Sequence, residues 1–198
     1  MTLMIFAVVL LGILFGYAFI PPEFLGRMDQ ISTLLLGLLI FSVGIDIGGN
    51  KGALKDIKSK GKMLGGLTSA VIIGSAIGGL ITGLIFRHPV NTSLAISAGY
   101  GWYSLSGILL KNLASAEIGA IAFMSNVFRE MMAFVLIPIL AIRVNHLTSI
   151  APPGATSMDT TLPIISRATT PDIAVVAFLN GLILSTLVPI LVPFFYAL

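Results

Sequence analysis

The sequence contains no cysteine and few charged residues, and each shortage excludes a class of protein. Without cysteine, the chain forms no disulfide and no thiolate metal site. Charged residues make up 10% of its 198 residues, whereas soluble domains carry about 25%. This composition excludes most soluble enzymes and nucleic-acid-binding proteins.

Motifs for catalysis and nucleotide binding are absent as well. The sequence has no GxSxG nucleophile elbow, no HExxH zinc-protease motif and no P-loop. Gly44-Ile-Asp46 lacks the GxGD pattern of intramembrane aspartyl proteases, and neither His88 nor His146 has an obvious nucleophile partner. We therefore expect no enzymatic activity and no metal or other cofactor.

Apolar residues, by contrast, are abundant. They form 57% of the chain, and the mean hydropathy is +1.05. A soluble domain of 198 residues cannot bury so much apolar surface, so the sequence predicts an integral membrane protein. The expected fold class is all-α: a polytopic transmembrane helix bundle with broken or re-entrant helices and no strands, of the kind that can form half of an inverted-repeat transporter.

Runs of about 20 apolar residues locate the membrane-spanning helices of a single transmembrane domain, 1–198. The predicted spans are 2–20, 31–49, 63–86, 90–110, 117–142 and 173–198, and 146–171 is predicted to be a broken or re-entrant segment. Within span 63–86, small residues recur at every fourth position in two rows: Ala70, Gly74, Gly78 and Ser75, Gly79, Gly83. Such rows predict close approach of neighbouring helices.

Lysines indicate how the chain is oriented in the membrane. The loop 50–62 holds five of them, opposed by Asp56: Lys51, Lys55, Lys58, Lys60 and Lys62. Basic residues in short loops stay on the cytoplasmic side. We therefore expect a multi-pass protein of the cell membrane, with the N-terminus and loop 50–62 in the cytoplasm.

Glu130 lies in the middle of span 117–142, where an ionised side chain is costly and usually functional. Arg129 is its neighbour, but adjacent helix positions lie about 100° apart, so the two are expected to face different elements. Asn126 precedes Glu130 by one helical turn and shares its face. Two interpretations remain open for Glu130: a residue of a transport site, or one half of a structural ion pair with another span.

A second acidic residue, Asp46, lies near the cytoplasmic end of span 31–49, within Gly44-Ile-Asp-Ile-Gly-Gly49. The flanking glycines indicate backbone that departs from the helix. The sequence leaves open whether Asp46 belongs to a site or only ends a helix.

Two further segments are poor candidates for lipid-facing helix. Ser97–Gly107 contains Trp102, Tyr103 and Ser104 among three glycines, and Pro152–Pro163 is rich in proline and hydroxyl groups. Non-helical backbone at membrane depth survives only against protein or a watery cavity. Thr156, Ser157 or Asp159 is expected to cap a half-helix, and half-helix ends are how many transporters build their midplane sites. Ordinary external loops are the alternative.

Several of these strings resemble the lysine exporter (LysO) family. They are Gly99-Tyr-Gly-Trp-Tyr-Ser-Leu-Ser-Gly-Ile-Leu-Leu110, Arg129-Glu130 with Leu136-Ile-Pro138, Gly154-Ala-Thr-Ser-Met-Asp-Thr-Thr-Leu-Pro163 and Gly181-Leu-Ile-Leu-Ser-Thr-Leu-Val-Pro-Ile190. The resemblance runs from about residue 30 to the end. In it, Glu130 matches the family's intramembrane glutamate, whereas Asp46 matches only through its Gly-Ile neighbours.

The resemblance implies a secondary transporter, or a subunit of one, that exports L-lysine and close analogues. Single-chain members carry further N-terminal spans, which implies a split transporter completed by a separate small membrane protein; a homo-oligomer is the alternative. Its expected partners are L-lysine, protons and the lipid membrane, and no nucleic acid. A cation/proton antiporter, or a carrier for another small organic substrate with the same architecture, is the competing function.

The mechanism expected from this resemblance couples lysine efflux to proton entry. Lysine carries a net positive charge, and moving one charge outward against 100 mV costs about 2.3 kcal/mol. Glu130 is expected to alternate between a proton and the lysine ammonium, with Asp46 as a second proton-coupling residue. The predicted substrate-binding residues are Glu130, Asn126, Asp159, Thr156, Ser157, Trp102, Tyr103 and Ser104, the ring of Trp102 or Tyr103 holding the cation.

Overall fold

A computed structural model gives the structure of the protein. It describes residues 11, 12, 14–16, 31, 34, 35, 38, 41, 45 and 51–198. The chain divides into two compact units, Met1–Gly49 and Asn50–Leu198. The described residues of the first unit are helical, and most of the predicted spans 2–20 and 31–49, together with Asp46, lies outside the described residues.

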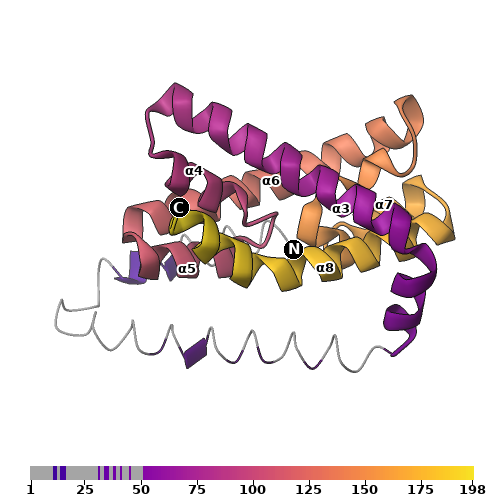
Figure 1. Ribbon diagram of the computed structural model, residues 1–198, viewed down its shortest axis with the longest axis horizontal. Helices are drawn as coiled ribbons and strands as arrows, with labels where there is room; N and C mark the ends of the chain where they lie inside the picture. Colours follow the sequence, from indigo (N-terminus) through magenta and orange to yellow (C-terminus); the bar gives the residue numbers. More distant parts are fainter. Residues whose placement is uncertain are drawn as a thin grey trace. The chain divides into compact units, whose positions relative to one another are not determined.

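The second unit is built from helices, and the described part of the chain contains no strand (Figure 1). Its elements are α3 (Lys51–Phe86), α4 (Val90–Ser97), α5 (Tyr103–Leu113), α6 (Ala116–Arg143), η2 (Thr148–Ile150), η3 (Gly154–Met158), α7 (Leu162–Ala168) and α8 (Pro171–Tyr196). The predicted all-α class is confirmed for these residues.

Three of the described helices are long and apolar enough to cross a membrane: Lys60–Phe86, Ala116–Arg143 and Pro171–Tyr196. They correspond to the predicted spans 63–86, 117–142 and 173–198. The main difference lies at the start of α3, because the helix begins at Lys51 and includes the segment expected to be a loop. Lysine is a good helix former and no proline intervenes, so nothing stops the helix before the apolar span.

The predicted span 90–110 is broken in the middle, as its glycines indicated. Helix α4 ends at Ser97 and α5 begins at Tyr103. Between them, Tyr100 and Gly101 have φ angles of 45° and 98°. Two consecutive residues in the left-handed region cannot continue a right-handed helix. The backbone therefore leaves the helical conformation at these two residues, and a separate helix, α5, starts after them.

The segment between α6 and α8 consists of short pieces: two single turns of 3-10 helix, η2 and η3, followed by α7. It packs against α8, where a Cβ on Gly181 would lie 2.6 Å from the Met158 backbone nitrogen. Helix α8 is the core of the unit, and Ala177, Leu184 and Val188 are fully buried in it. Its last turn meets α4, because Asn91 Nδ2 donates a hydrogen bond of 3.0 Å to the Tyr196 carbonyl.

One of the two small-residue rows of α3 forms a close helix contact. A Cβ on Gly79 would lie 2.6 Å from Ser97 Oγ, and one on Gly83 would collide with Ser93 Oγ. These glycines allow α4 to lie directly against α3. In the other row, a Cβ on Gly74 or Gly78 would meet nothing within 4 Å in the described part of the chain.

Candidate functional site

The two non-helical segments predicted from the sequence touch each other. The Ala155 backbone nitrogen donates a hydrogen bond of 2.7 Å to the Tyr100 carbonyl. A Cβ on Gly101 would lie 2.7 Å from the Pro153 carbonyl, and one on Gly154 would collide with the Tyr100 carbonyl. Gly154 also has a φ of 64°, so glycine is required there both for conformation and for space. We call this contact between 100–101 and 153–155 the backbone crossing.

Asn126 of α6 holds the first broken segment in place. Its Oδ1 accepts a hydrogen bond of 2.7 Å from the Gly101 backbone nitrogen. Its Nδ2 donates to the Ala122 carbonyl, and at 3.3 Å to the Ile96 carbonyl and Ser106 Oγ. Both ends of this buried amide are therefore engaged by the protein, and they link the end of α4 to the start of α5.

Arg129, one turn further along α6, holds the second broken segment. Its Nε donates to the Pro152 carbonyl at 2.8 Å, and its Nη2 donates to the Ala151 carbonyl at 3.4 Å. Its Nη1 donates to Ser75 Oγ on α3 at 2.8 Å. Arg129 therefore connects α3, α6 and the segment before η3.

Glu130 is adjacent to Arg129 and has a different environment. Its side chain is 1% exposed, and neither carboxylate oxygen accepts a hydrogen bond in the described part of the chain. The ion pair found among the described side chains lies elsewhere, between Lys60 and Asp172 at 3.6 Å. The expectation that Arg129 and Glu130 address different neighbours is confirmed.

The neighbours of Glu130 come from both broken segments. Asp159 interacts electrostatically with its carboxylate, and the Thr160 side chain lies beside it. Tyr103, at the start of α5, interacts with both Glu130 and Asp159. Thr160 lies close to the carboxylate without completing a hydrogen bond to it. We call Glu130, Tyr103, Asp159 and Thr160 the acidic cluster. Because Asp159 is exposed while Glu130 is buried, the cluster extends from the protein surface to its interior.

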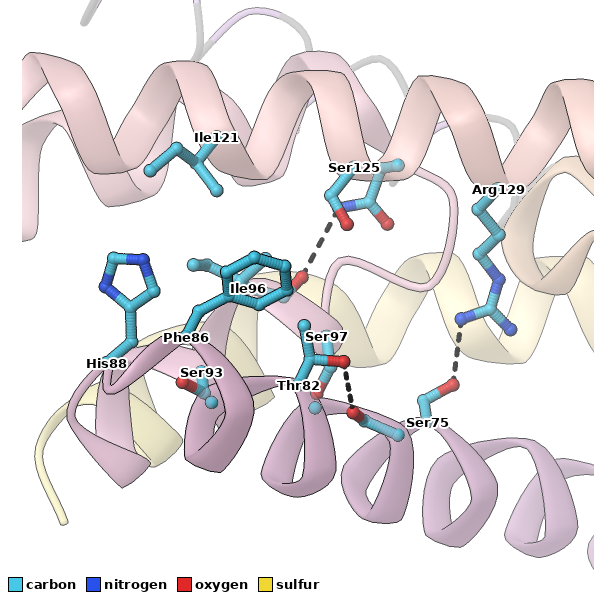
Figure 2. A pocket seen from close by; sticks show the side chains of 14 residues that line it. Ser75, Thr82, Phe86, His88, Ser93, Ile96, Ser97, Ile121, Ser125 and Arg129 are labelled. Atoms are coloured by element: carbon cyan, nitrogen blue, oxygen red, sulfur yellow. Dashed lines mark hydrogen bonds between the residues drawn. The ribbon is translucent and has the colours of Figure 1, made fainter.

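A cavity lies between α3, α4 and α6. Its volume is about 500 Å³, and its lining includes Ser75, Thr82, Ser97, Ser125 and Arg129. Figure 2 shows Arg129 and Ser75 facing each other at one end of this cavity and His88 at the other end. A second cavity of about 440 Å³ also reaches Ser75 and Arg129 and continues along α6 to Leu140. The hydrogen-bonded pair Arg129 and Ser75 therefore lines both cavities.

Comparison with known proteins decides the family. The sequence profile described as "Lysine exporter LysO" matches residues 6–196 of this chain. The chain belongs to the lysine exporter LysO family. The resemblance inferred from the motifs is thereby confirmed, and it extends further toward the N-terminus than the motifs indicated.

Two known proteins are similar to this chain. Lysine exporter LysO of Escherichia coli (strain K12) is 41% identical over 198 residues, which are 99% of this chain and 64% of that protein. A Haemophilus influenzae protein described as "Putative lysine exporter" is 34% identical over 189 residues, which are 94% of each chain. The chain thus spans less than two thirds of the E. coli protein. No solved structure matches it significantly.

The remaining predicted binding residues of this LysO-family chain lie around the backbone crossing. Ser157 Oγ donates to the carbonyls of Gly154 and Ala177 at 2.7 and 2.8 Å, and Thr156 Oγ1 donates to the Pro153 carbonyl at 3.1 Å. Trp102 and Ser104 are half-buried at the start of α5. These side chains lie within the broken segments, as expected, and the two hydroxyls donate their protons to backbone carbonyls.

One detail of the sequence interpretation is wrong. The sequence predicts that Thr156, Ser157 or Asp159 caps a half-helix, but the N-cap of α7 is Thr161, and it makes no side-chain capping bond. Proline in the first turn of α7 supplies no N–H that needs a cap. Asp159 Oδ1 instead accepts bonds from the Thr160 backbone nitrogen at 2.5 Å and from Thr160 Oγ1 at 3.3 Å.

Sequence reasoning missed Ser75 and Thr160 and gave Arg129 no partner. The residues that Arg129 contacts lie more than 20 positions away in the sequence, so no local pattern indicates them. The helical spacing of Ser125 and Arg129, together with the row Ser75, Gly79, Gly83, was the available signal that these polar groups share one interface.

Proposed function

We propose that this chain is a secondary transporter, or a subunit of one, that exports L-lysine and close analogues across the cytoplasmic membrane by proton antiport. Membership of the LysO family supports lysine as the substrate. The observation that carries the mechanism is the buried Glu130, whose carboxylate has no hydrogen-bond partner in the described part of the chain. An acidic group in that position is available to bind a proton or a cation.

The energetics favour a coupled mechanism. Exporting a lysine cation against 100 mV costs about 2.3 kcal/mol, and the sequence has no P-loop to supply that energy from a nucleotide. Protons entering the cell release comparable energy per charge. In our proposal, Glu130 releases its proton when it binds the lysine ammonium, and a proton arriving from outside displaces lysine.

The acidic cluster offers a route for this exchange. Asp159 is exposed and Glu130 is buried, while Thr160 and the Tyr103 hydroxyl lie in the same cluster. Protons and ammonium groups are stabilised by carboxylates and hydroxyls placed in series. The aromatic rings of Tyr103 and Trp102 provide faces for a cation at the same end of α5.

The groups around the backbone crossing are proposed to bind the α-ammonium group of lysine. Ser104, Thr156 and Ser157 lie on the two broken segments with Tyr103 and Asp159, and Asn126 fixes the first of them. Hydroxyls that donate to backbone carbonyls still have lone pairs to accept from an ammonium group. Asp46 remains a proposed second proton-coupling residue.

A cation/proton antiporter is the second candidate. The acidic cluster places two carboxylates, Glu130 and Asp159, near the Thr160 hydroxyl, and oxygen ligands of this kind suit small hard cations. This function predicts proton movement driven by an inorganic cation in the absence of lysine.

The deciding experiment is lysine counterflow in proteoliposomes, with radiolabelled lysine outside and unlabelled lysine inside. The full chain is reconstituted alone and with a candidate small membrane protein that supplies the proposed additional spans. Lysine exchange in either preparation supports the proposal, and exchange only with the partner supports two half-transporters. Proton movement driven by sodium or potassium, without any lysine exchange, contradicts the lysine assignment and favours the antiporter.

A variant pair locates the acid in the same proteoliposomes when a pH gradient is imposed across them. Glu130→Gln removes the buried charge, and Glu117→Gln removes an exposed charge in the first turn of the same helix. Loss of pH-driven lysine transport in Glu130→Gln, with normal transport in Glu117→Gln, is the expected result. Full pH-driven transport by Glu130→Gln contradicts the proposed coupling role.

A further inference from the structure

Arg129 has donors that the protein does not use. Each of its three nitrogens makes one hydrogen bond, from Nε to Pro152, from Nη1 to Ser75 and from Nη2 to Ala151. Each Nη of a guanidinium carries two N–H groups. One N–H on each terminal nitrogen therefore remains free of the partners seen in the described part of the chain.

Ser75 also has an unused donor. Its Oγ accepts from Arg129, and its own O–H reaches no acceptor among the described residues. Other hydroxyls of the same cavity are committed to helix carbonyls: Thr82 donates to Gly78, Ser93 to Pro89 and Ser97 to Leu94. Ser75 and Arg129 thus present adjacent free donors at one place.

These donors face space whose described lining contains no acid. Arg129 and Ser75 line both cavities, and the residues lining either cavity include no aspartate or glutamate. The Arg129 guanidinium is consequently a positive charge at membrane depth without a paired carboxylate in the described part of the chain. An unpaired guanidinium favours binding of an anion. Its N–H groups, together with a neighbouring hydroxyl, match the two oxygens of a carboxylate.

We propose that Arg129 and Ser75 form a carboxylate-binding site that takes the α-carboxylate of the transported amino acid. This inference rests on the proposed transport function and adds the group that distinguishes an amino acid from a simple diamine. The cavity of about 500 Å³ is of the size that small ligands occupy. Thr82 and Ser125 line the same space, and their oxygens are acceptors for ammonium groups.

This site is separate from the acidic cluster. Glu130 lines neither cavity, and its neighbours lie on α5 and on the segment after η3. Arg129 and Glu130 therefore face different surroundings in this conformation. The carboxylate site therefore recognises substrate in the cavity, whereas Glu130 handles the proton and the cation in the coupling step.

Ligand pairs that differ only in the carboxylate test this assignment. Lysine and cadaverine both carry two ammonium groups, and only lysine carries a carboxylate. Isothermal titration of the purified full chain, with its partner protein if one is required, gives Kd for each. We expect the wild-type protein to bind lysine about tenfold to a hundredfold more tightly than cadaverine, and Arg129→Gln to remove most of this preference.

A second, milder variant tests the site in case Arg129→Gln fails to fold. Arg129→Gln also loses its bonds to the Pro152 and Ala151 carbonyls, whereas Ser75→Ala removes only one hydroxyl. We expect Ser75→Ala to reduce the lysine-to-cadaverine preference several-fold while cadaverine affinity stays constant. Ser69→Ala, at an exposed position on the same helix, is the matched control and keeps the wild-type preference.

The outcomes separate this site from the proposed function. One outcome is that the wild-type protein binds lysine with the same lysine-to-cadaverine affinity ratio as Ser75→Ala and Arg129→Gln. In that case the carboxylate site is wrong and the lysine transport proposal stands. If wild-type protein does not bind lysine, the lysine assignment fails, and the same comparison with arginine and agmatine decides the site. Equal affinities for arginine and agmatine would also overturn the carboxylate site.

Discussion

The polar residues near the middle of α6 fall into two groups with opposite hydrogen bonding. Asn126 and Arg129 form hydrogen bonds with the backbone of the broken segments. Glu130 is buried beside them but accepts no hydrogen bond in the described part of the chain. Leaving one buried charge unpaired costs several kcal/mol. The difference indicates that Asn126 and Arg129 position the broken segments, while the Glu130 carboxylate is left available to a proton or a cation.

Glu130→Gln is expected to have the largest effect on function and little effect on folding. The amide is nearly the same size and removes an unpaired buried charge, so thermal stability should stay constant or rise. Lysine export by cells that depend on this protein should fall at least tenfold. A Glu130→Gln protein that unfolds readily would instead mean that the carboxylate has a structural partner, and Glu130 would no longer differ from Asn126 and Arg129.

Gly154→Ala is expected to damage the backbone crossing most. Its φ of 64° disfavours any Cβ, and the added atom would collide with the Tyr100 carbonyl. The cost should be about 2–3 kcal/mol, measured as a lower midpoint in thermal unfolding of the purified protein. Gly74→Ala is the control, because its Cβ meets nothing within 4 Å in the described residues; it should leave the midpoint constant or raise it.

Asn126→Ala tests the residues of α6 that are bonded to the backbone. It removes the acceptor of the Gly101 N–H and the donors to Ile96 and Ser106, which should destabilise the protein by about 1–3 kcal/mol. Asn112→Ala, at an exposed position on α5, should change stability little. If Asn126→Ala keeps wild-type stability and loses lysine binding, Asn126 is a ligand-binding residue in its own right, as the sequence pattern predicted.

Asp159→Asn should have the smallest effect of the series. Its carboxylate is exposed and bonds only to Thr160 among the described residues, so the variant should fold normally. Because Asp159 lies between the surface and Glu130 in the acidic cluster, the rate of pH-driven lysine transport should fall about two- to fivefold, less than Glu130→Gln. Unchanged rates would remove Asp159 from the proposed route.

The long helices and the broken segments were predictable because they follow from local composition. Runs of apolar residues located α6 and α8 within a few positions, and the glycines near Tyr100 indicated the break after α4. The divergence of Arg129 and Glu130 followed from the 100° rotation per residue in a helix. Each of these features depends on residues that are close in the sequence.

The features that sequence did not predict depend on contacts between distant residues. The backbone crossing joins Tyr100 to Ala155, and Arg129 meets Ser75 on α3. Asn126 shares a helix face with Glu130, as expected, but spacing alone does not show that its amide already has protein partners. The capping prediction failed because a proline in the first turn lets α7 begin without a side-chain cap.

The most direct test of the account measures proton movement together with lysine transport. Proteoliposomes containing the chain, with its partner protein if one is required, enclose a pH-sensitive dye and receive an external pulse of lysine. The account predicts proton movement opposite to lysine in the wild-type protein and none in Glu130→Gln. Lysine-dependent proton movement of normal size in Glu130→Gln would contradict the central role of this residue.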